Sequence, residues 1–175
     1  SRRQRQMCIR DSPEVVKKEH ENELRHFYHQ AHLPVRVQDE ALGHSVRAVY
    51  LYSGMADVAR VDDDDALYEA CLKLWNNITQ KKMYVTGGIG ATHLGEAFSF
   101  NYDLPNDTAY SETCAAIGLV FFARRMLEIK PDRRFSDVME RALYNTVLAG
   151  MAADGKSFFY VNPLEVYPKA CHEDA

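Results

Sequence analysis

The sequence predicts an all-α chain built from successive antiparallel helix hairpins. Three observations support this class: apolar side chains recur at helical intervals in five stretches, most connections between these stretches are short, and only one short stretch has the pattern of a strand. The 175 residues suit one domain or a slice of a larger one, and the composition, 46% hydrophobic and 26% charged, is that of a globular protein. Such hairpins pack as a solenoid or as a closed ring.

The first predicted helix runs from about residue 13 to residue 32. Its start carries a capping hydroxyl, Ser12, followed by a proline at the first helical position and an acid in the first turn. Pro34 sets its end, because the residue before a proline is disfavoured in helical geometry. The preceding stretch, 1–12, is basic and has no apolar pattern, so we interpret it as a non-native or disordered leader.

Two further helices are predicted on either side of an acidic turn. Apolar residues recur at helical intervals through 39–61 and again through 67–78. Four aspartates, 62–65, lie between these stretches, and acids stabilise a helix when they lie at its N-terminus. The two helices are therefore suited to form a hairpin.

A long segment without helical period, 83–107, follows the third helix. Four glycines and a proline punctuate it, and a loop of this length inside a compact domain is usually functional. Its Gly-Gly-Ile-Gly run, 87–90, invites a phosphate-loop interpretation, but the Walker lysine and the dinucleotide spacing are both missing. A sharply turning loop explains the glycines equally well.

The last part of the chain predicts two helices and a short strand. Residues 108–130 are apolar almost all round, which indicates a helix buried on most sides, and Pro131 ends it. An amphipathic helix is predicted through 138–147. A turn at 154–155 then leads into a short β segment at 157–161.

Charge and cysteine content exclude several classes of partner. Lys and Arg total 21 and Asp and Glu total 25, so the net charge of −4 provides no basic surface for nucleic acid or for an anionic membrane. The longest apolar run, 114–123, is far shorter than the roughly 20 residues of a membrane span. We therefore expect no nucleic-acid partner and no membrane partner. The four cysteines are widely spaced without a C-x-x-C pair, which favours a reducing compartment such as the cytoplasm.

Glu96 is the first candidate for acid-base chemistry. It follows the glycine-rich loop directly, and aromatic neighbours such as Phe98 would desolvate it and favour its protonated form. Its position in the sequence alone does not distinguish it from a solvated loop glutamate.

Glu112 and Cys114 are candidate metal ligands. A capping glutamate would need Ser, Thr, Asp or Asn three residues earlier, and position 109 is Ala, so Glu112 is not part of a capping box. Side chains two apart diverge by about 200° on a regular helix, so joint coordination requires a helix start or irregular backbone. Carboxylate and thiolate both bind zinc, but a zinc site needs at least three protein ligands, and a buried inert Cys114 stays open. Three histidines also share a face of the first predicted helix, namely His26, His29 and His32. Two interpretations stay open for them: they bind a metal, or they pack against neighbouring side chains.

Several motifs together are similar to glycoside hydrolase family 127, the β-L-arabinofuranosidases. The resemblance begins near residue 20 and continues in order to the end of the chain. It lies in the stretches 43–48, 82–90, 95–96, 102–106, 110–114, 140–145 and 160–164.

This resemblance implies that 13–175 is part of an (α/α)6-barrel catalytic domain, truncated at both ends. It also implies a zinc ion held by one glutamate and three cysteines, one of which is the nucleophile of a retaining mechanism. By motif, Glu112 and Cys114 match the first two zinc ligands and Glu96 matches the general acid/base. His44 and Tyr160 match residues that form hydrogen bonds with the arabinofuranose hydroxyls. Without the resemblance, His44 would be interpreted as a partly buried, hydrogen-bonded histidine and Tyr160 as an aromatic side chain in the core.

The sequence departs from the family pattern at the remaining ligands. The family's nucleophile and fourth ligand form an adjacent cysteine pair expected downstream of 162–164, and the 175 residues contain no such pair. Cys171 matches a segment upstream of that pair and is not the nucleophile. We therefore expect the isolated chain to be inactive, as part of an enzyme acting on an arabinofuranoside-containing glycan. The alternatives are a related α/α-barrel glycosidase of other sugar specificity, and a non-catalytic helical-repeat scaffold.

Overall fold

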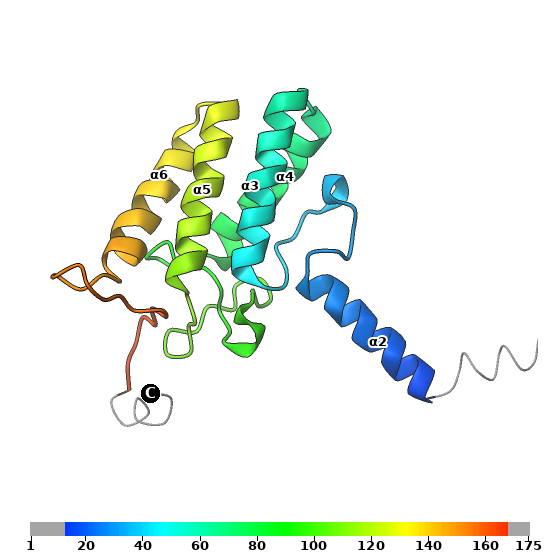
Figure 1. Cartoon of the computed structure of the whole chain (residues 1–175), viewed down its shortest axis with the longest axis horizontal. Helices are drawn as coiled ribbons and strands as arrows, with labels where there is room; N and C mark the ends of the chain where they lie inside the picture. The colour runs from blue at the N-terminus through cyan, green and yellow to red at the C-terminus, as the bar shows by residue number, and fades with distance from the viewer. Residues whose placement is uncertain (1–12, 168–175) are drawn as a thin grey trace, which may run out of the picture.

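Helices make up most of the chain, which confirms the predicted all-α class (Figure 1). The computed structural model describes residues 13–167, with side chains from residue 21 onward; the predicted leader 1–12 and Cys171 lie outside this range. The α-helices are α2 (Pro13–Tyr28), α3 (Ser45–Asp62), α4 (Asp65–Asn77), α5 (Thr113–Ile129) and α6 (Arg133–Ala142). The shorter elements are the 3-10 turns η1 (Val35–Val37) and η3 (Leu94–Glu96) and the π-helical turns η2 (Ile78–Lys82) and η4 (Leu143–Leu148).

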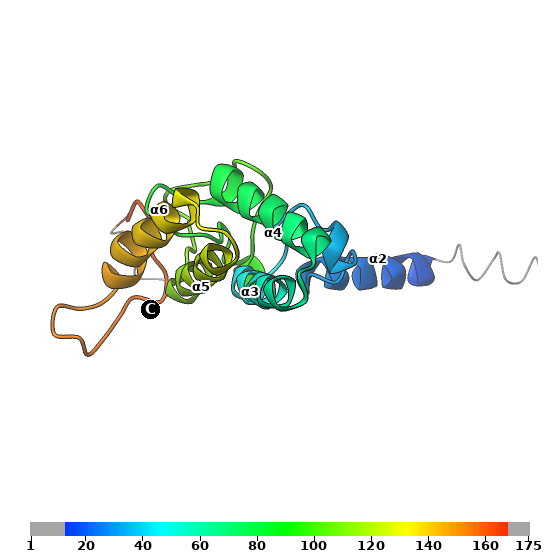
Figure 2. The same ribbon diagram turned by 90° about the horizontal axis from the view of Figure 1, so that it is seen from above.

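Two helical hairpins, α3 with α4 and α5 with α6, form the body of the fold. Helices α3 and α5 pack side by side, and α4 and α6 lie on one side of that pair (Figure 2). Helix α2 projects away from the hairpins (Figure 1). Because α3 and α5 both begin at the end where the long loop lies, their N-termini and the loop share one end of the molecule (Figure 1).

An aromatic cluster joins the four packed helices. Trp75 of α4 lies edge-on to Phe122 of α5, with ring centroids 5.6 Å apart, and to Phe135 of α6 at 5.0 Å. The Tyr52 ring of α3 also packs against Phe122, with ring centroids 5.8 Å apart. All four side chains are fully buried, so this cluster is the centre of the hydrophobic core.

Replacing Phe122 by alanine is expected to lower the free energy of unfolding by about 3–5 kcal/mol, because a cavity would open beside its two aromatic neighbours, Tyr52 and Trp75. Phe121, the next residue on α5, is 41% exposed, and Phe121→Ala should cost less than about 1.5 kcal/mol. Urea unfolding of the two variants and the parent chain measures both changes. Equal losses would show that the helices do not pack around Phe122.

Three helices are shorter than their apolar patterns predict. Two of them begin later than expected, because the backbone just before them is left-handed, and one ends earlier. The helix expected from 39 begins at Ser45, since Gly43 is left-handed (φ 70°) and His44 is the capping residue. The helix expected from 108 begins at Thr113, after the left-handed Ser111 (φ 40°). The first helix ends at Tyr28.

This early end separates the three histidines that were predicted to share one helical face. His32 lies beyond α2 and stacks on Phe27, with ring centroids 5.0 Å apart. His29 lies 3.1 Å from the Arg47 guanidinium through its Nδ1. Two of the three histidines are thus engaged in packing and hydrogen bonding rather than in a common site.

The predicted β segment at 157–161 is present as isolated bridges. Phe158 pairs with Met151, and Val161 pairs with Glu112. The second bridge brings the C-terminal segment to the start of α5. In the part of the chain that the structure describes, no helix is both long and apolar enough to cross a bilayer.

Candidate active site

The long loop brings its candidate residues to the N-termini of α3 and α5. His44, which caps α3, forms an antiparallel bridge with Ala97, and the Phe98 amide donates to the Gly43 carbonyl at 2.9 Å. The Ser111 amide donates to the Gly90 carbonyl at 2.8 Å. The loop is therefore hydrogen-bonded to both helix starts, so Glu96 lies next to His44.

Two glycines of this loop are required by close packing. A Cβ on Gly88 would lie 2.0 Å from the Ser111 hydroxyl oxygen. A Cβ on Gly90, whose φ is 91°, would lie 2.8 Å from the Ser45 hydroxyl oxygen. The glycines thus let the loop reach the two helix starts, which accounts for them without a bound phosphate.

Glu96 has hydrogen-bonding partners on both carboxylate oxygens. Its Oε2 lies 3.0 Å from His44 Nε2, and its Oε1 accepts from the Tyr110 hydroxyl at 3.2 Å. Its backbone is left-handed (φ 53°), and Ser45 Oγ donates to its carbonyl at 3.0 Å. The side chain is 36% exposed, so this carboxylate is held in place and remains open to a reactant.

The segment that carries His44 is held by buried polar side chains. The Lys82 ammonium donates to the Ala41 carbonyl at 2.8 Å, and Asn77 Oδ1 accepts from the Ala41 amide at 3.0 Å. Gln30 Nε2 donates to the Leu42 carbonyl at 2.8 Å. Burial lowers the pKa of Lys82, and Glu40 offsets part of this effect through an ion pair of 2.9 Å. These contacts fix the backbone that leads into His44.

Glu112 is a buried carboxylate, 1% exposed. Among the residues that the structure describes, neither of its oxygens has a hydrogen-bonding partner. It occupies the N-cap position of α5, but its side chain does not cap the helix. Glu112 is therefore not part of a capping box, as its sequence context predicts. A buried, unpaired carboxylate is unfavourable unless something positively charged occupies its vicinity.

Cys114 and Tyr160 lie beside this carboxylate. Tyr160 lies on the C-terminal segment, and its backbone carbonyl accepts a hydrogen bond from the Thr113 amide at 3.0 Å. Asn162 Nδ2 strengthens the connection by donating to the Ser111 carbonyl at 2.9 Å and to Thr113 Oγ1 at 3.1 Å. The Tyr160 and Tyr110 rings are in contact, with centroids 6.2 Å apart. Because Tyr110 bonds Glu96 and Tyr160 lies beside Glu112, the side chains around the two carboxylates adjoin each other.

The negative potential of Glu112 affects both neighbouring groups. Approach of the Tyr160 hydroxyl to the Glu112 carboxylate, outside the geometry of a regular hydrogen bond, is the larger cause that holds the pKa of Tyr160 well above its usual value, and burial adds to it. Burial, followed by the charge of Glu112, raises the pKa of the Cys114 thiol. A cation at this position would reverse the second effect, because a metal favours the thiolate that binds it.

The donors present fit half of a zinc site. Carboxylates and thiolates both bind zinc, and at this helix start the Cys114 thiol lies close enough to the Glu112 carboxylate to interact with it. Within residues 21–167, no three His, Cys, Asp or Glu side chains come together closely enough to hold a metal. The described residues thus place one carboxylate and one thiol of the kind that a zinc site uses next to each other.

The structure brings all five predicted site residues together, and it adds Tyr110, Asn77 and Lys82. Tyr110 precedes Glu112 by two residues, and no pattern in the sequence shows that its hydroxyl reaches Glu96. Asn77 and Lys82 could have been found as polar residues at the end of an apolar helical pattern, but their partner, the segment before His44, is set by tertiary structure.

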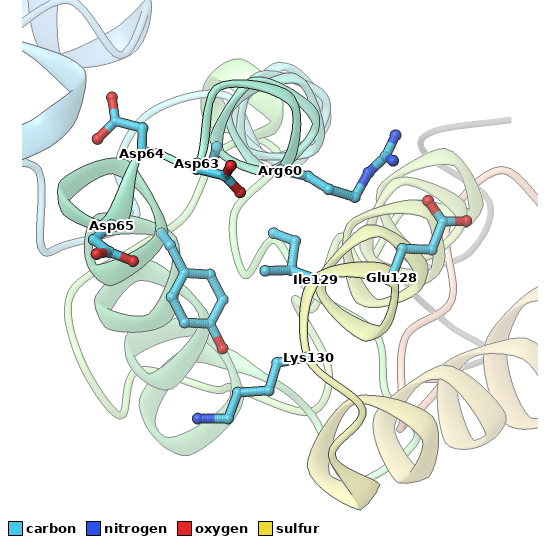
Figure 3. Close-up of a pocket in the computed structure, with 9 residues that line it drawn as sticks. Arg60, Asp63, Asp64, Asp65, Glu128, Ile129 and Lys130 are labelled. Atoms are coloured by element: carbon cyan, nitrogen blue, oxygen red, sulfur yellow. The ribbon is translucent and has the colours of Figure 1, made fainter.

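A hollow lies at the opposite end of the helices from the candidate site, and none of the predicted site residues lines it. It has a volume of about 330 Å³. It lies where α3 and α5 end and α4 begins, and its lining mixes acids with Arg60 and Lys130 (Figure 3). Asp64, one of these acids, is already occupied as the N-cap of α4 and by Arg36.

Comparison with known proteins identifies the family. A family model described as β-L-arabinofuranosidase, GH127 catalytic domain, matches residues 5–174. The chain belongs to glycoside hydrolase family 127. The resemblance found in the motifs is thereby confirmed.

Relatives of this family 127 chain have been solved and curated. The chain is 59% identical to a GH127 β-L-arabinofuranosidase from Geobacillus stearothermophilus T6, with a TM-score of 0.82. The match covers 85% of this chain and 23% of the Geobacillus chain. A solved GH127 β-arabinofuranosidase, BT3674, is 57% identical with a TM-score of 0.77, and the match covers 79% of this chain and 22% of the other. The non-reducing end β-L-arabinofuranosidase of Bifidobacterium longum subsp. longum is 48% identical over 141 residues, which are 81% of this chain and 21% of the relative.

The family 127 chain therefore spans about a fifth of the length of these relatives. Its helical hairpins match the corresponding part of the solved enzymes.

Proposed function

We propose that this chain supplies the acid/base and two zinc ligands of a zinc-dependent, retaining β-L-arabinofuranosidase that acts on arabinofuranoside-containing glycans. The observation that carries the proposal is the convergence of two different carboxylates. Glu96 is held and accessible, whereas Glu112 is buried and unpaired beside a thiol. Family membership and similarity to named arabinofuranosidases support the sugar and the reaction. We also propose that 13–175 is part of an (α/α)6 barrel.

Each carboxylate would have a separate task. Glu96 would protonate the departing glycosidic oxygen, and would then take a proton from the water that releases the sugar. Glu112 and Cys114 would hold zinc, which when bound lowers the pKa of ligating thiols and supplies a thiolate at neutral pH. The nucleophilic cysteine of the proposal belongs to an adjacent pair that is absent from these 175 residues.

His44 and Tyr160 would bind the sugar. His44 Nε2 lies 3.0 Å from Glu96, and the Tyr160 hydroxyl lies beside Glu112 and Cys114, so the two side chains flank the acid/base and the proposed metal. Both can hydrogen-bond sugar hydroxyls. A furanose ring between them would present its anomeric carbon to the space between Glu96 and the zinc site.

A chimeric enzyme tests the proposal. In this chimera the present chain replaces the aligned segment of the Geobacillus enzyme, to which it is 59% identical. We expect the zinc-loaded chimera to hydrolyse an aryl β-L-arabinofuranoside within about 10-fold of the parent kcat/KM, since the proposed residues are all present. Aryl α-L-arabinofuranoside and aryl β-D-galactopyranoside should not be turned over. A folded chimera that prefers another sugar would favour a related glycosidase, and one without turnover would contradict the proposal.

A further inference from the structure

The two oxygens of Glu96 face chemically different partners. Oε2 faces the imidazole of His44 at 3.0 Å, and Oε1 faces the hydroxyl of Tyr110 at 3.2 Å. An imidazole nitrogen is either a donor or an acceptor in a given tautomer, whereas a hydroxyl can be either one by rotation. Glu96 therefore has one fixed partner and one adaptable partner.

The cap of α3 determines the tautomer of His44. The Arg47 amide donates to His44 Nδ1 at 3.4 Å, so Nδ1 carries the lone pair and Nε2 carries the hydrogen. Nε2 is therefore a donor to Oε2. A proton on Oε2 would place two hydrogens between the same pair of atoms, so the acid form of Glu96 cannot carry its proton there without breaking this bond.

The Tyr110 hydroxyl accommodates both protonation states at the other oxygen. When Glu96 is ionised, the hydroxyl donates to Oε1, as the structure shows. When Oε1 carries a proton, the same hydroxyl can accept it after a rotation about its C–O bond. The Tyr110 ring lies edge-on to the Tyr160 ring, with centroids 6.2 Å apart, and this contact helps to hold the hydroxyl in place.

We propose that Tyr110 is a positioning residue that places the acid proton of Glu96 on Oε1. The proposal rests on the proposed function of Glu96 as the acid/base. In the first step, the Oε1 proton moves to the glycosidic oxygen as the bond from that oxygen to the anomeric carbon breaks. The bonding pair stays on oxygen, and the nucleophilic thiolate of the proposed function forms a bond to the anomeric carbon. Tyr110 then donates to the ionised Oε1. In the second step, Oε1 takes a proton from water as the water oxygen bonds to the anomeric carbon and the thiolate leaves with its bonding pair, which returns Glu96 to its acid form.

Tyr110→Phe in the zinc-loaded chimera tests this role, because it removes the hydroxyl and keeps the ring. For alkyl arabinofuranosides, which need protonation, kcat/KM should fall about 10- to 100-fold, whereas for a dinitrophenyl arabinofuranoside it should change less than about 3-fold. The alkaline limb of the pH profile should move to higher pH, since a donor to the ionised carboxylate is lost. The matched control is Tyr102→Phe, an exposed tyrosine on the same loop, which should leave both readouts unchanged.

Equal losses on both substrates with an unmoved pH profile would overturn the role of Tyr110. The failure of the proposed function is recognised separately, because Glu96→Gln would then show no dependence on the leaving group. The tautomer is tested in the 175-residue chain itself by nitrogen-15 NMR of its histidines. We expect the His44 signals of the Nε2–H tautomer; an Nδ1–H tautomer would contradict the placement on Oε1.

Discussion

Glu96→Gln in the chimera is expected to lower kcat/KM for an alkyl β-L-arabinofuranoside by about 1,000-fold, because a poor leaving group cannot depart without a proton. For a dinitrophenyl arabinofuranoside, kcat/KM should fall less than about 10-fold, since this leaving group departs as a stable anion. Glutamine keeps the size of the side chain and can still bond His44 and Tyr110. The difference between the substrates therefore reports the proton alone.

The same variant separates the two roles of Glu96. With the activated substrate, kcat should fall although kcat/KM is nearly retained, because water attack in the second step loses its base and becomes limiting. The matched control is Glu128→Gln, a surface glutamate near the end of α5 that pairs with Arg124, which should leave every constant unchanged. Equal losses of Glu96→Gln on both substrates would exclude Glu96 as the acid.

Glu112→Gln and Cys114→Ser are each expected to reduce bound zinc from about one ion per molecule to less than about a tenth, and to abolish measurable turnover. In the proposed four-ligand site, loss of one ligand should weaken zinc binding more than the 10- to 100-fold that follows loss of an outer partner. Zinc content is measured by elemental analysis after gel filtration. Cys71→Ala is the matched control, because Cys71 is a free thiol buried in the core and away from the site.

Because Glu112 is buried and unpaired among the described residues, Glu112→Gln should change the Tm of the metal-free and the zinc-loaded protein differently. Burial of a charge without a partner destabilises the fold, so Glu112→Gln should raise or preserve the Tm of the metal-free chimera. In the zinc-loaded chimera the same change should lower the Tm, because binding energy that stabilises the native state is lost. Retention of zinc by either ligand variant would contradict the assignment of these residues.

The helices could be predicted from the sequence because their apolar periodicity reports the core directly. Trp75, Phe122 and the residues around them follow that pattern and are buried. The helix starts were less accessible to prediction. Whether α3 begins at residue 39 or at Ser45 depends on the left-handed Gly43 and on a side-chain cap from His44, and both are set by contacts with the loop and with Tyr28.

The candidate site was predicted as separate motifs, and its assembly depends on long-range contacts. Glu96 and His44 are 52 residues apart, and Thr113 and Phe159 are 46 apart. No periodicity relates such distant positions. The resemblance to the family supplied the grouping, whereas the hydrogen bond from Tyr110 to Glu96 and the unpaired state of Glu112 required the folded structure.

Anomalous diffraction at the zinc edge from crystals of the chimera soaked with L-arabinose locates the metal and the sugar in one experiment. We expect one zinc peak within about 2.0–2.3 Å of a Glu112 oxygen and the Cys114 sulfur. We also expect a furanose between His44 and Tyr160, with its anomeric oxygen within about 3 Å of Glu96. A zinc ion bound away from Glu112 and Cys114, or a sugar bound away from Glu96, would contradict the roles proposed for these residues.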